Sequence, residues 1–205
     1  MRITGGLLAG RKIAYPNAAG AKEIRPSMDK MRESVFAALG DISGCSFLDI
    51  FSGSGIIAIE AASRGAAFIE AVEQDKLKRK ILLENVSISP VYINCKFMPA
   101  ELYIKRAVKN GHEKKAFNII FLDPPFPYRY KWELVENIVS SNLAAFRTKI
   151  IIHRPRQDYL KNEIHDLEKT DCREYGRSVV DFFLVIKKEN NSSTGVTSAE
   201  NKKDE

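Results

Sequence analysis

Short runs of apolar residues alternate along this chain with longer stretches of helical periodicity, and this alternation restricts the possible folds more than any other feature. The apolar runs are FLDI (47–50), FIEAVE (68–73), INCKFM (93–98), NIIFL (118–122) and KIIIH (149–153). The helical stretches are IIAIEAASR (56–64), KLKRKILLENV (76–86), AELYIKRAVKN (100–110) and KWELVENIVSS (131–141), with Gly65 and Gly111 as stops. Because the runs are continuous in apolar character, each is typical of a strand buried on both faces. The pattern predicts an α/β fold, a mostly parallel sheet with helices on both faces.

Three further segments lie outside this repeating pattern. VVDFFLVIKK (179–188) follows the turn-like EYGRS and predicts a last strand that returns antiparallel at an edge of the sheet. Residues 1–15 predict a small hairpin, and SMDKMRESVFAAL (27–39) predicts a helix with Ser27 as its N-cap. The expected sheet has about seven strands.

We divide the chain into three parts. Residues 1–40 are predicted to form a basic hairpin and helix that cover RNA or cofactor, and residues 41–188 the main α/β domain. Residues 189–205 are polar and lack core-forming side chains, so we expect a disordered tail. A chain of 205 residues is ample for one domain and short for two.

The positive charge of the chain is concentrated at its amino-terminal end. Within residues 1–40, seven basic residues face three acidic ones, so this segment carries most of the net charge of +6. The basic residues are Arg2, Arg11, Lys12, Lys22, Arg25, Lys30 and Arg32. A concentrated basic arm attracts a phosphate backbone, although a solvated surface explains such a count equally well.

Several classes of protein are disfavoured by what the sequence lacks. It has no run of about 18 apolar residues, so no transmembrane helix is expected. Glycines and basic residues interrupt the amino terminus before any signal-peptide core, which indicates a cytoplasmic protein. The three cysteines form no CxxC pair and the three histidines have no ligand spacing, so we expect reduced thiols and no metal site. No long exposed apolar pattern demands a partner chain, and a monomer is expected.

A glycine-containing loop follows the first predicted strand, because FLDI leads directly into FSGSG and then a helix. Gly53 and Gly55 can adopt backbone angles closed to other residues and let a ligand approach the main chain at the positive end of that helix. Glu73 ends the second strand, where a carboxylate can accept both hydroxyl hydrogens of a ribose. These residues suggest an adenosine pocket. Taken alone they fit a nicotinamide or flavin dinucleotide, S-adenosylmethionine or a mere turn, since GSGIIA also matches G-x-G-x-x-A.

Asp49 favours S-adenosylmethionine among these ligands, because it stands at the end of the first strand, before the glycines. There its carboxylate would face the loop and hold the amino group of a bound methionine moiety, directly or through water. The alternative is that Asp49 caps amides of the loop.

The stretch FLDPPF places an acid, two prolines and an aromatic at the open end of the fourth predicted strand, on the same sheet edge as the glycine loop. An exocyclic amine on a base is a poor nucleophile, because its lone pair is delocalised into the ring. Hydrogen bonds from that amine to the Asp123 carboxylate and the Pro124 carbonyl would free the lone pair, and the two prolines, Pro124 and Pro125, would keep the backbone from reorganising. Phe126 would stack on the base. DPPF alone fits an ordinary turn, but with Glu73 and the glycine loop it predicts methyl transfer.

These motifs resemble the bacterial 16S rRNA guanine-N2 methyltransferases, a Rossmann-like, S-adenosylmethionine-dependent family, from Arg2 to about Lys188. The resemblance is carried by RITGGLLAGRKI (2–13), RPSMDKMRESVFAAL (25–39), FLDIFSGSGIIAIEAASRGA (47–66), FIEAVEQD (68–75), FLDPPF (121–126) and YGRSVVDFFLV (175–185). The segment at 25–39 is the most specific, because generic amino-methyltransferases share DPPF without it.

The resemblance implies methyl transfer from S-adenosylmethionine to the exocyclic N2 of a guanine, with 16S rRNA or a small-subunit assembly intermediate as partner. The residues implied to line the cofactor site are Asp49, Phe51, Gly53, Gly55, Glu73, Gln74 and Ala100. The residues implied to hold the guanine are Asp123, Pro124, Pro125 and Phe126. The residues implied to contact RNA are Arg2, Arg11, Lys12, Arg25 and Arg32. Closure over the cofactor is the alternative for Arg25 and Arg32, and helix packing is a further alternative for Arg32.

Three places depart from the family pattern. Pro99 and Ala100 stand where the family usually carries an acid, and His153 stands where it favours Glu after the fifth strand. Phe51 replaces the first glycine of the general methyltransferase loop.

Three other functions stay open on the sequence. A DNA adenine or cytosine amino-methyltransferase uses the same DPP and aromatic, but 205 residues leave little room for a module that reads duplex DNA. A nicotinamide-dependent oxidoreductase would explain GSGIIA, and a non-catalytic RNA-binding protein could keep the same fold.

Overall fold

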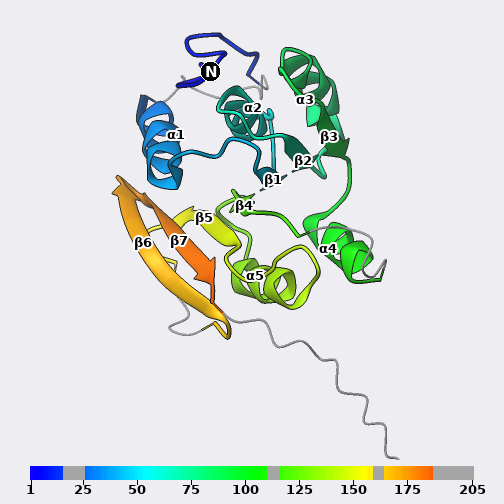
Figure 1. Ribbon diagram of the computed structural model, residues 1–205, viewed down its shortest axis with the longest axis vertical. Helices are drawn as coiled ribbons and strands as arrows, with labels where there is room; N and C mark the ends of the chain where they lie inside the picture. The colour runs from blue at the N-terminus through cyan, green and yellow to red at the C-terminus, as the bar shows by residue number, and fades with distance from the viewer. Residues whose placement is uncertain (16–25, 110–115, 159–163, 187–205) are drawn as a thin grey trace, which may run out of the picture.

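The computed structural model describes residues 1–15, 26–109, 116–158 and 164–186 (Figure 1). Its centre is a seven-stranded sheet in the order β3-β2-β1-β4-β5-β7-β6. The strands are β1 (Ser46–Ile50), β2 (Phe68–Val72), β3 (Ile93–Lys96), β4 (Ile119–Leu122), β5 (Lys149–Pro155), β6 (Leu167–Tyr175) and β7 (Ser178–Val185). The first five are parallel to one another, and β7 runs antiparallel to both β5 and β6. The predicted fold class is confirmed.

The strand β6 was not predicted from the sequence, and β7 was placed wrongly at the edge of the sheet. The last strand, β7, is antiparallel as expected but lies second from the edge, because β6 pairs along its outer side. Most side chains of β6 are exposed or half-buried, and its sequence LEKTDCREY has no apolar run. A polar edge strand of this kind gives no hydrophobic signal in the sequence.

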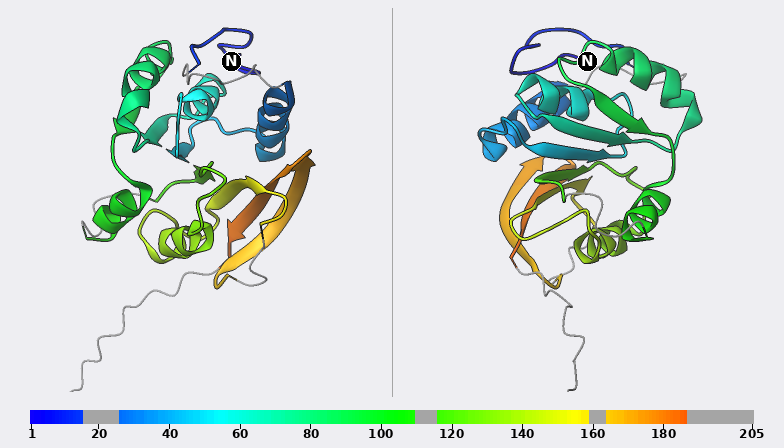
Figure 2. Two further views of the ribbon diagram at one scale, coloured as in Figure 1. Left: turned by 180° about the vertical axis from the view of Figure 1, so that it is seen from behind. Right: turned by 45° about the vertical axis from the view of Figure 1, so that its right-hand side comes forward.

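Helices cover both faces of the sheet, as Figures 1 and 2 show. The helices are α1 (Pro26–Leu39), α2 (Ile56–Ser63), α3 (Arg79–Val86), α4 (Ala100–Lys109) and α5 (Lys131–Ser140), with the short 3-10 helix η1 (Lys76–Lys78) before α3. The first three lie on one face, and α4 and α5 lie on the other. The predicted stop at Gly111 lies outside the described residues.

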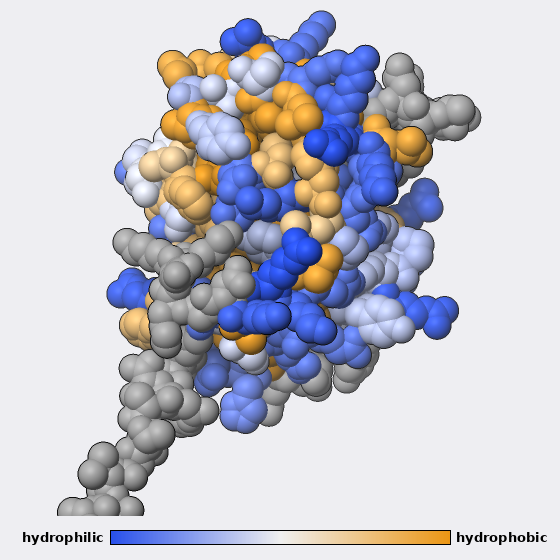
Figure 3. Space-filling view, turned by 90° about the vertical axis from the view of Figure 1, so that its right-hand side faces the viewer, coloured by the Kyte–Doolittle hydropathy of each residue, from blue (hydrophilic) through white to orange (hydrophobic). Residues whose placement is uncertain are grey.

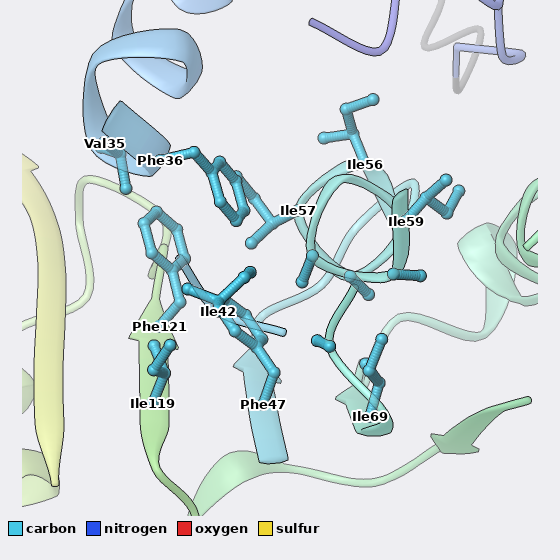
Figure 4. Packing of buried hydrophobic residues seen from close by; sticks show 14 of the residues in the cluster. Val35, Phe36, Ile42, Phe47, Ile56, Ile57, Ile59, Ile69, Ile119 and Phe121 are labelled. Atoms are coloured by element: carbon cyan, nitrogen blue, oxygen red, sulfur yellow. The ribbon is translucent and has the colours of Figure 1, made fainter. Parts of the chain in front are cut away.

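The core on the first face forms where α1 and α2 meet β1 and β4 (Figure 4). Phe36 from α1 stacks on Phe47 from β1, with ring centroids 6.1 Å apart, and Ile57 from α2 lies beside them. Burying one such side chain contributes roughly 1.5–3 kcal/mol. Every residue of α2 is buried, because the sheet covers one side and the amino-terminal segment covers the other.

The amino-terminal segment is a hairpin-like loop with a single antiparallel bridge, between Arg2 and Lys12. Ile3 and Ile13 enter the same core as α1 and β1, and the backbone N–H and hydroxyl of Thr4 donate to the buried Glu60 carboxylate. Residues 1–15 and α1 therefore share one core with the sheet, and packing is continuous across the expected boundary at residue 40.

The helix α1 begins at Pro26, so Ser27 lies in its first turn and the prediction that Ser27 is the N-cap was wrong. Proline is well suited to the first position of a helix, where no backbone N–H is needed. The predicted tail, residues 189–205, lies outside the described residues. Among the helices that the structure describes, none is long and apolar enough to span a membrane.

Candidate functional site

The main pocket opens at the carboxyl ends of the parallel strands, the edge where open α/β sheets bind ligands. Its volume is about 1260 Å³, larger than the roughly 300–1,000 Å³ of a typical small-molecule site. The loops after β1, β2 and β4 contribute Gly53, Glu73 and Asp123 to its wall, and the strand β5 contributes His153. The structure thus brings the glycine loop and the DPPF segment together around one space.

Glu73 joins the glycine loop to the loop after β2 through two hydrogen bonds from backbone N–H groups. Its carboxylate is 4% exposed and accepts from the Gly53 N–H at 2.7 Å and the Asp75 N–H at 2.8 Å. A carboxylate oxygen has more than one acceptor site, so Glu73 retains capacity for a ligand hydroxyl. Gly53 has a φ of 58° and, where a Cβ would stand, no atom closer than 3.9 Å, so a ligand can approach its main chain. Gln74 also lines the pocket and is exposed.

Phe51 lines the pocket in an unusual backbone conformation, with a φ of 66°. This left-handed region is disfavoured for residues with a Cβ by roughly 1–2 kcal/mol. The ring of Phe51 packs edge-on against Tyr128, with centroids 5.3 Å apart. The conformation explains why a glycine suits this position in the general loop, and the aromatic contact offsets the cost here.

Asp49 lies behind the pocket wall and does not line it. It is 1% exposed, and one carboxylate oxygen accepts from the Ser52 hydroxyl at 2.6 Å and the Ala58 N–H at 3.2 Å. Burial raises its pKa to about 7, and the nearby carboxylates of Asp123 and Glu73 add to the rise. Asp49 therefore binds the loop through the Ser52 hydroxyl and caps the first turn of α2 through the Ala58 N–H, rather than a loop amide, while it keeps a second oxygen and a readily titrated charge.

Two more residues expected at the cofactor site also do not line the pocket. Gly55 faces α3, since a Cβ on it would stand 2.6 Å from Leu82 and 3.2 Å from Val86. Ala100 is 2% exposed and belongs to the core under α4. Pro99, its neighbour, lines the pocket instead.

The DPPF segment leaves β4 with Asp123 half-exposed and Pro124 buried, while Pro125 and Phe126 are exposed. All four residues line the pocket. The Asp123 N–H donates to the carbonyl of Ile50 at 3.2 Å, which ties this segment to the end of β1. Asp123 and the glycine loop therefore begin from neighbouring strands at one level of the sheet.

Lys131, at the start of α5, holds the chain that follows Phe126. Its ammonium donates to the carbonyls of Phe126 at 3.1 Å and Tyr128 at 2.5 Å, and pairs with the Asp158 carboxylate at 2.7 Å. Lys131 is 5% exposed, so these contacts satisfy a buried charge. No pattern in the sequence indicates this role, because Lys131 is an ordinary polar first residue of a predicted helix.

His153 stands beside Asp123 on the next strand. Its Nδ1 lies 2.8 Å from Asp123 Oδ1, and its ring packs edge-on against Phe126 at 5.7 Å. The far wall comes from α1, through Met28 and Met31, and from the turn between β6 and β7, residues 175–178. The YGRS motif marked this turn in the sequence, but nothing there indicated that it faces the pocket.

The basic residues expected to contact RNA are placed differently from one another. Arg2, Arg11 and Lys12 are exposed on the amino-terminal loop. Arg32 is 1% exposed and donates to the Arg2 carbonyl and the Asp29 carboxylate. Its expected contact with RNA does not agree with this burial, and the packing alternative does. Arg25 lies outside the described residues.

A second hollow, of about 440 Å³, lies between α3 and β3 and shares Phe97 with the main pocket. On this side of the molecule the hydrophobic surface gathers over α3 and β3, bordered by hydrophilic residues (Figure 3). Tyr92 is 83% exposed here, and the guanidinium of Arg79 lies 4.8 Å from the centroid of the Phe97 ring.

Residues 1–184 match the family described as "Conserved hypothetical protein 95". The chain belongs to this family. A curated relative from Escherichia coli K12, ribosomal RNA small subunit methyltransferase D, is 34% identical over 128 residues, which cover 62% of this chain and 60% of that protein. The chain thus spans less than two thirds of that relative. A Bacillus subtilis protein named provisionally as the rRNA methyltransferase YlbH is 31% identical and covers 86% of this chain and 94% of its own length. The family resemblance drawn from the motifs is confirmed.

The fold of the family is also found among solved structures. An Escherichia coli protein named provisionally as the methyltransferase yhhF superposes with a TM-score of 0.75 at 23% identity, covering 91% of this chain and 98% of the other. At this identity the likeness supports the fold alone.

Proposed function

We propose that this protein transfers a methyl group from S-adenosylmethionine to the exocyclic N2 amine of a guanine in small-subunit rRNA. The observation that carries the proposal is the shared pocket, in which Asp123 to Phe126 stand across from Gly53 and Glu73. The names of the relatives support rRNA as the substrate class.

The residues around the glycine loop fit S-adenosylmethionine. Glu73 would accept the ribose hydroxyls beside its bond from the Gly53 N–H, and the open space at Gly53 would admit the ligand against the main chain. Asp49 supplies a negative charge for the amino group, reached through water or through movement of the loop. When bound, S-adenosylmethionine supplies a methyl group on a positively charged sulfur.

The DPPF segment orients the amine and takes its proton. Asp123 accepts a hydrogen bond from the amine, which restores the nucleophilic lone pair, and the Pro124 carbonyl accepts the second. Phe126, 49% exposed, offers a face on which the base stacks. The methylated amine is strongly acidic, so its proton passes to Asp123 or to water.

The amino-terminal segment is proposed to guide the RNA. Arg2, Arg11 and Lys12 are exposed on one loop, where they can neutralise phosphates without reading bases. Selection of the target guanine would then depend on the shape of the RNA or of an assembling small subunit.

The test is transfer of radiolabelled methyl from S-adenosylmethionine to 16S rRNA and to small subunits from cells that lack this methylation. We expect label in N2-methylguanosine, identified by mass spectrometry. Asp123→Ala should abolish transfer while RNA affinity stays within about twofold, which separates an enzyme from an RNA-binding protein. Label on duplex DNA instead, or binding of NADH without S-adenosylmethionine in calorimetry, would contradict the proposal.

A further inference from the structure

His153 is the one imidazole that the described structure places in the pocket wall, and its surroundings are specific. It is 6% exposed and lies on β5, directly beside Asp123 because β4 and β5 pair in parallel with Leu122 opposite Ile152. The contact from Nδ1 to Asp123 Oδ1 is 2.8 Å. The other ring nitrogen, Nε2, is buried and has no hydrogen-bond partner among the described atoms.

These contacts favour one protonation state of the ring. A carboxylate can only accept, so the hydrogen of the contact belongs to Nδ1. A second proton on Nε2 would create a buried donor with nothing to receive it, which is costly. The arrangement is therefore that of a neutral imidazole with Nδ1 protonated and Nε2 bare.

We propose that neutral His153 is the positioning residue for Asp123. By binding Oδ1, the imidazole fixes the plane of the carboxylate and leaves Oδ2 for the target amine. The contact with Phe126 lets the same ring fix the aromatic face on which the base would stack. The proposal rests on the proposed methyl transfer and adds a residue to it.

Protonation of His153 would oppose the reaction in two ways. An imidazolium would hold Asp123 in an ion pair, and a carboxylate so paired is a weaker acceptor for the proton of the amine. It would also add a positive charge to the pocket that receives a sulfonium. In the reaction His153 keeps its own proton, and the proton of the amine goes to Asp123 Oδ2.

Further titratable or charged groups lie in the pocket wall or on the elements around β5, and they enter any pH profile. They are Asp49 and Asp123 at the ends of β1 and β4, Glu73 after β2, Asp29 and Arg32 on α1, Arg173 and Tyr175 on β6, Arg177 in the following turn, and the pair Arg154 and Asp181 on β5 and β7. Of these, Asp123 is the one for which a direct contact with the ring is seen.

The experiment compares His153→Asn, His153→Leu and the control His165→Asn, which changes an exposed histidine just before β6. Asparagine keeps a donor toward Asp123 but cannot titrate, whereas leucine keeps only bulk. At saturating S-adenosylmethionine we expect kcat to fall about 20-fold for leucine and at most threefold for asparagine, with the cofactor Kd within about twofold for both. His165→Asn should match the wild type.

The pH profile separates positioning from a merely structural role. As pH is lowered, kcat of the wild type should fall once the imidazole gains a second proton, and His153→Asn, which cannot gain one, should flatten that fall. Saturating cofactor removes the contribution of Asp49, which acts on cofactor affinity. A kcat for His153→Leu within twofold of wild type, or an unchanged acid limb for His153→Asn, would overturn the proposal.

A measurement without turnover keeps this test distinct from that of the proposed function. Nitrogen NMR of the imidazoles, assigned with the His153→Asn variant, should show Nδ1 protonated and Nε2 bare in the wild type. Asp123→Ala should remove that preference. Protonated Nε2 in the wild type would refute the positioning role, even if the protein methylates rRNA. The expected tautomer in a protein that transfers no methyl group would instead support the contact between His153 and Asp123 and contradict the proposed reaction.

Discussion

The pocket has two halves that are held in different ways: the glycine-loop half, which comprises Asp49, residues 51–55 and Glu73, and the DPPF half, residues 123–126. In the first half, the buried carboxylates of Asp49 and Glu73 accept hydrogen bonds from backbone N–H groups of the glycine loop, of α2 and of the loop after β2. In the second, the side chains of Lys131 and His153 reach in from α5 and β5, and Phe126 is exposed. The first half is thus part of the folded core, while the second is an exposed segment held by two side chains from outside it, Lys131 and His153.

This difference predicts separate consequences of mutation. Changes in the glycine-loop half should alter stability and cofactor affinity, because the same bonds carry both. Changes to Lys131 or His153 should lower kcat and leave cofactor affinity nearly unchanged.

The largest effect is expected for Gly55→Ala. The new Cβ would stand 2.6 Å from the Leu82 side chain, and the alanine backbone would have to keep a φ of 83°. Overpacking and the left-handed backbone together should lower the free energy of unfolding by about 3 kcal/mol, which lowers Tm by roughly 6–12 °C for a chain of this size. Calorimetry measures this shift.

Gly10→Ala is the matched control, since Gly10 has a φ of 82° but nothing within 4 Å of its Cβ position. Gly10→Ala should lower the free energy of unfolding only by the cost of the left-handed backbone, about 1 kcal/mol. Equal losses for the two variants would show that close packing against α3 contributes nothing at Gly55.

The next effect concerns Asp49 and pH. Its pKa in the folded protein is raised to about 7, mainly by burial. The folded protein therefore holds the Asp49 proton more tightly than the unfolded chain does. The stability that this gives is fully present below the ordinary pKa of 3.8 and is lost as pH rises through about 7. Asp49→Asn should therefore gain stability relative to wild type as pH rises from about 5 to about 8.

Binding of S-adenosylmethionine, if it needs the ionised carboxylate, should release a proton below pH 7. The cofactor affinity of the wild type should then rise about tenfold per pH unit well below pH 7, and roughly fiftyfold from pH 5 to pH 7. Asp49→Asn should bind weakly and without this dependence. Calorimetric titrations in buffers of different ionisation enthalpy measure the proton release, and a wild-type affinity independent of pH would contradict it.

A smaller effect is expected in the DPPF half, for Lys131→Met. Methionine keeps the apolar stem and removes the three donors that hold the carbonyls of Phe126 and Tyr128 and the Asp158 carboxylate. We expect kcat to fall about 20-fold, equivalent to roughly 1.8 kcal/mol, because the DPPF segment loses its fixed orientation. Cofactor Kd should change by less than about twofold.

Lys80→Met serves as its control, since the Lys80 side chain is 89% exposed and pairs only with Glu84 at 3.9 Å in the described structure. It should leave kcat unchanged. A loss of cofactor affinity in Lys131→Met as large as the loss of kcat would show that the two halves are not independent.

The same contrast explains what could be predicted from the sequence. The strands β1 to β5 were predicted within a few residues, because burial on both faces leaves continuous apolar runs in the sequence. The sheet edge that carries Asp123 and Glu73 followed from the alternation of strands and helices, which indicates parallel strands. The polar strand β6 left no such signal.

The direction of a side chain could not be predicted in the same way. Asp49, Gly55 and Ala100 stand at the expected positions in the chain, yet each faces the interior. Lys131 was missed because its partners are backbone carbonyls, which every residue has and which only the folded turn brings together. Spacing in a motif thus fixes the edge at which a residue lies, whereas packing decides what it contacts.

The smallest effect is expected for Phe51→Gly, where the two halves meet. Phe51 belongs to the glycine loop but packs on Tyr128, which follows DPPF, so its ring links the halves at 5.3 Å. Glycine would remove the cost of a φ of 66°, about 1–2 kcal/mol. It would lose an aromatic contact of about 0.5–1.5 kcal/mol and the packing of the ring against the core under α4 and α5. Since the gain and the losses oppose each other, the free energy of unfolding should change by less than about 1 kcal/mol.

Phe51→Ala separates the two contributions, because alanine loses the ring and keeps most of the backbone cost. It should be less stable than Phe51→Gly by about 1 kcal/mol in denaturant unfolding. If the alanine variant were as stable as the glycine variant, the left-handed backbone would not be what makes glycine suit this position. The ring would then matter to the protein as a link between the halves, and kcat should fall in both variants alike.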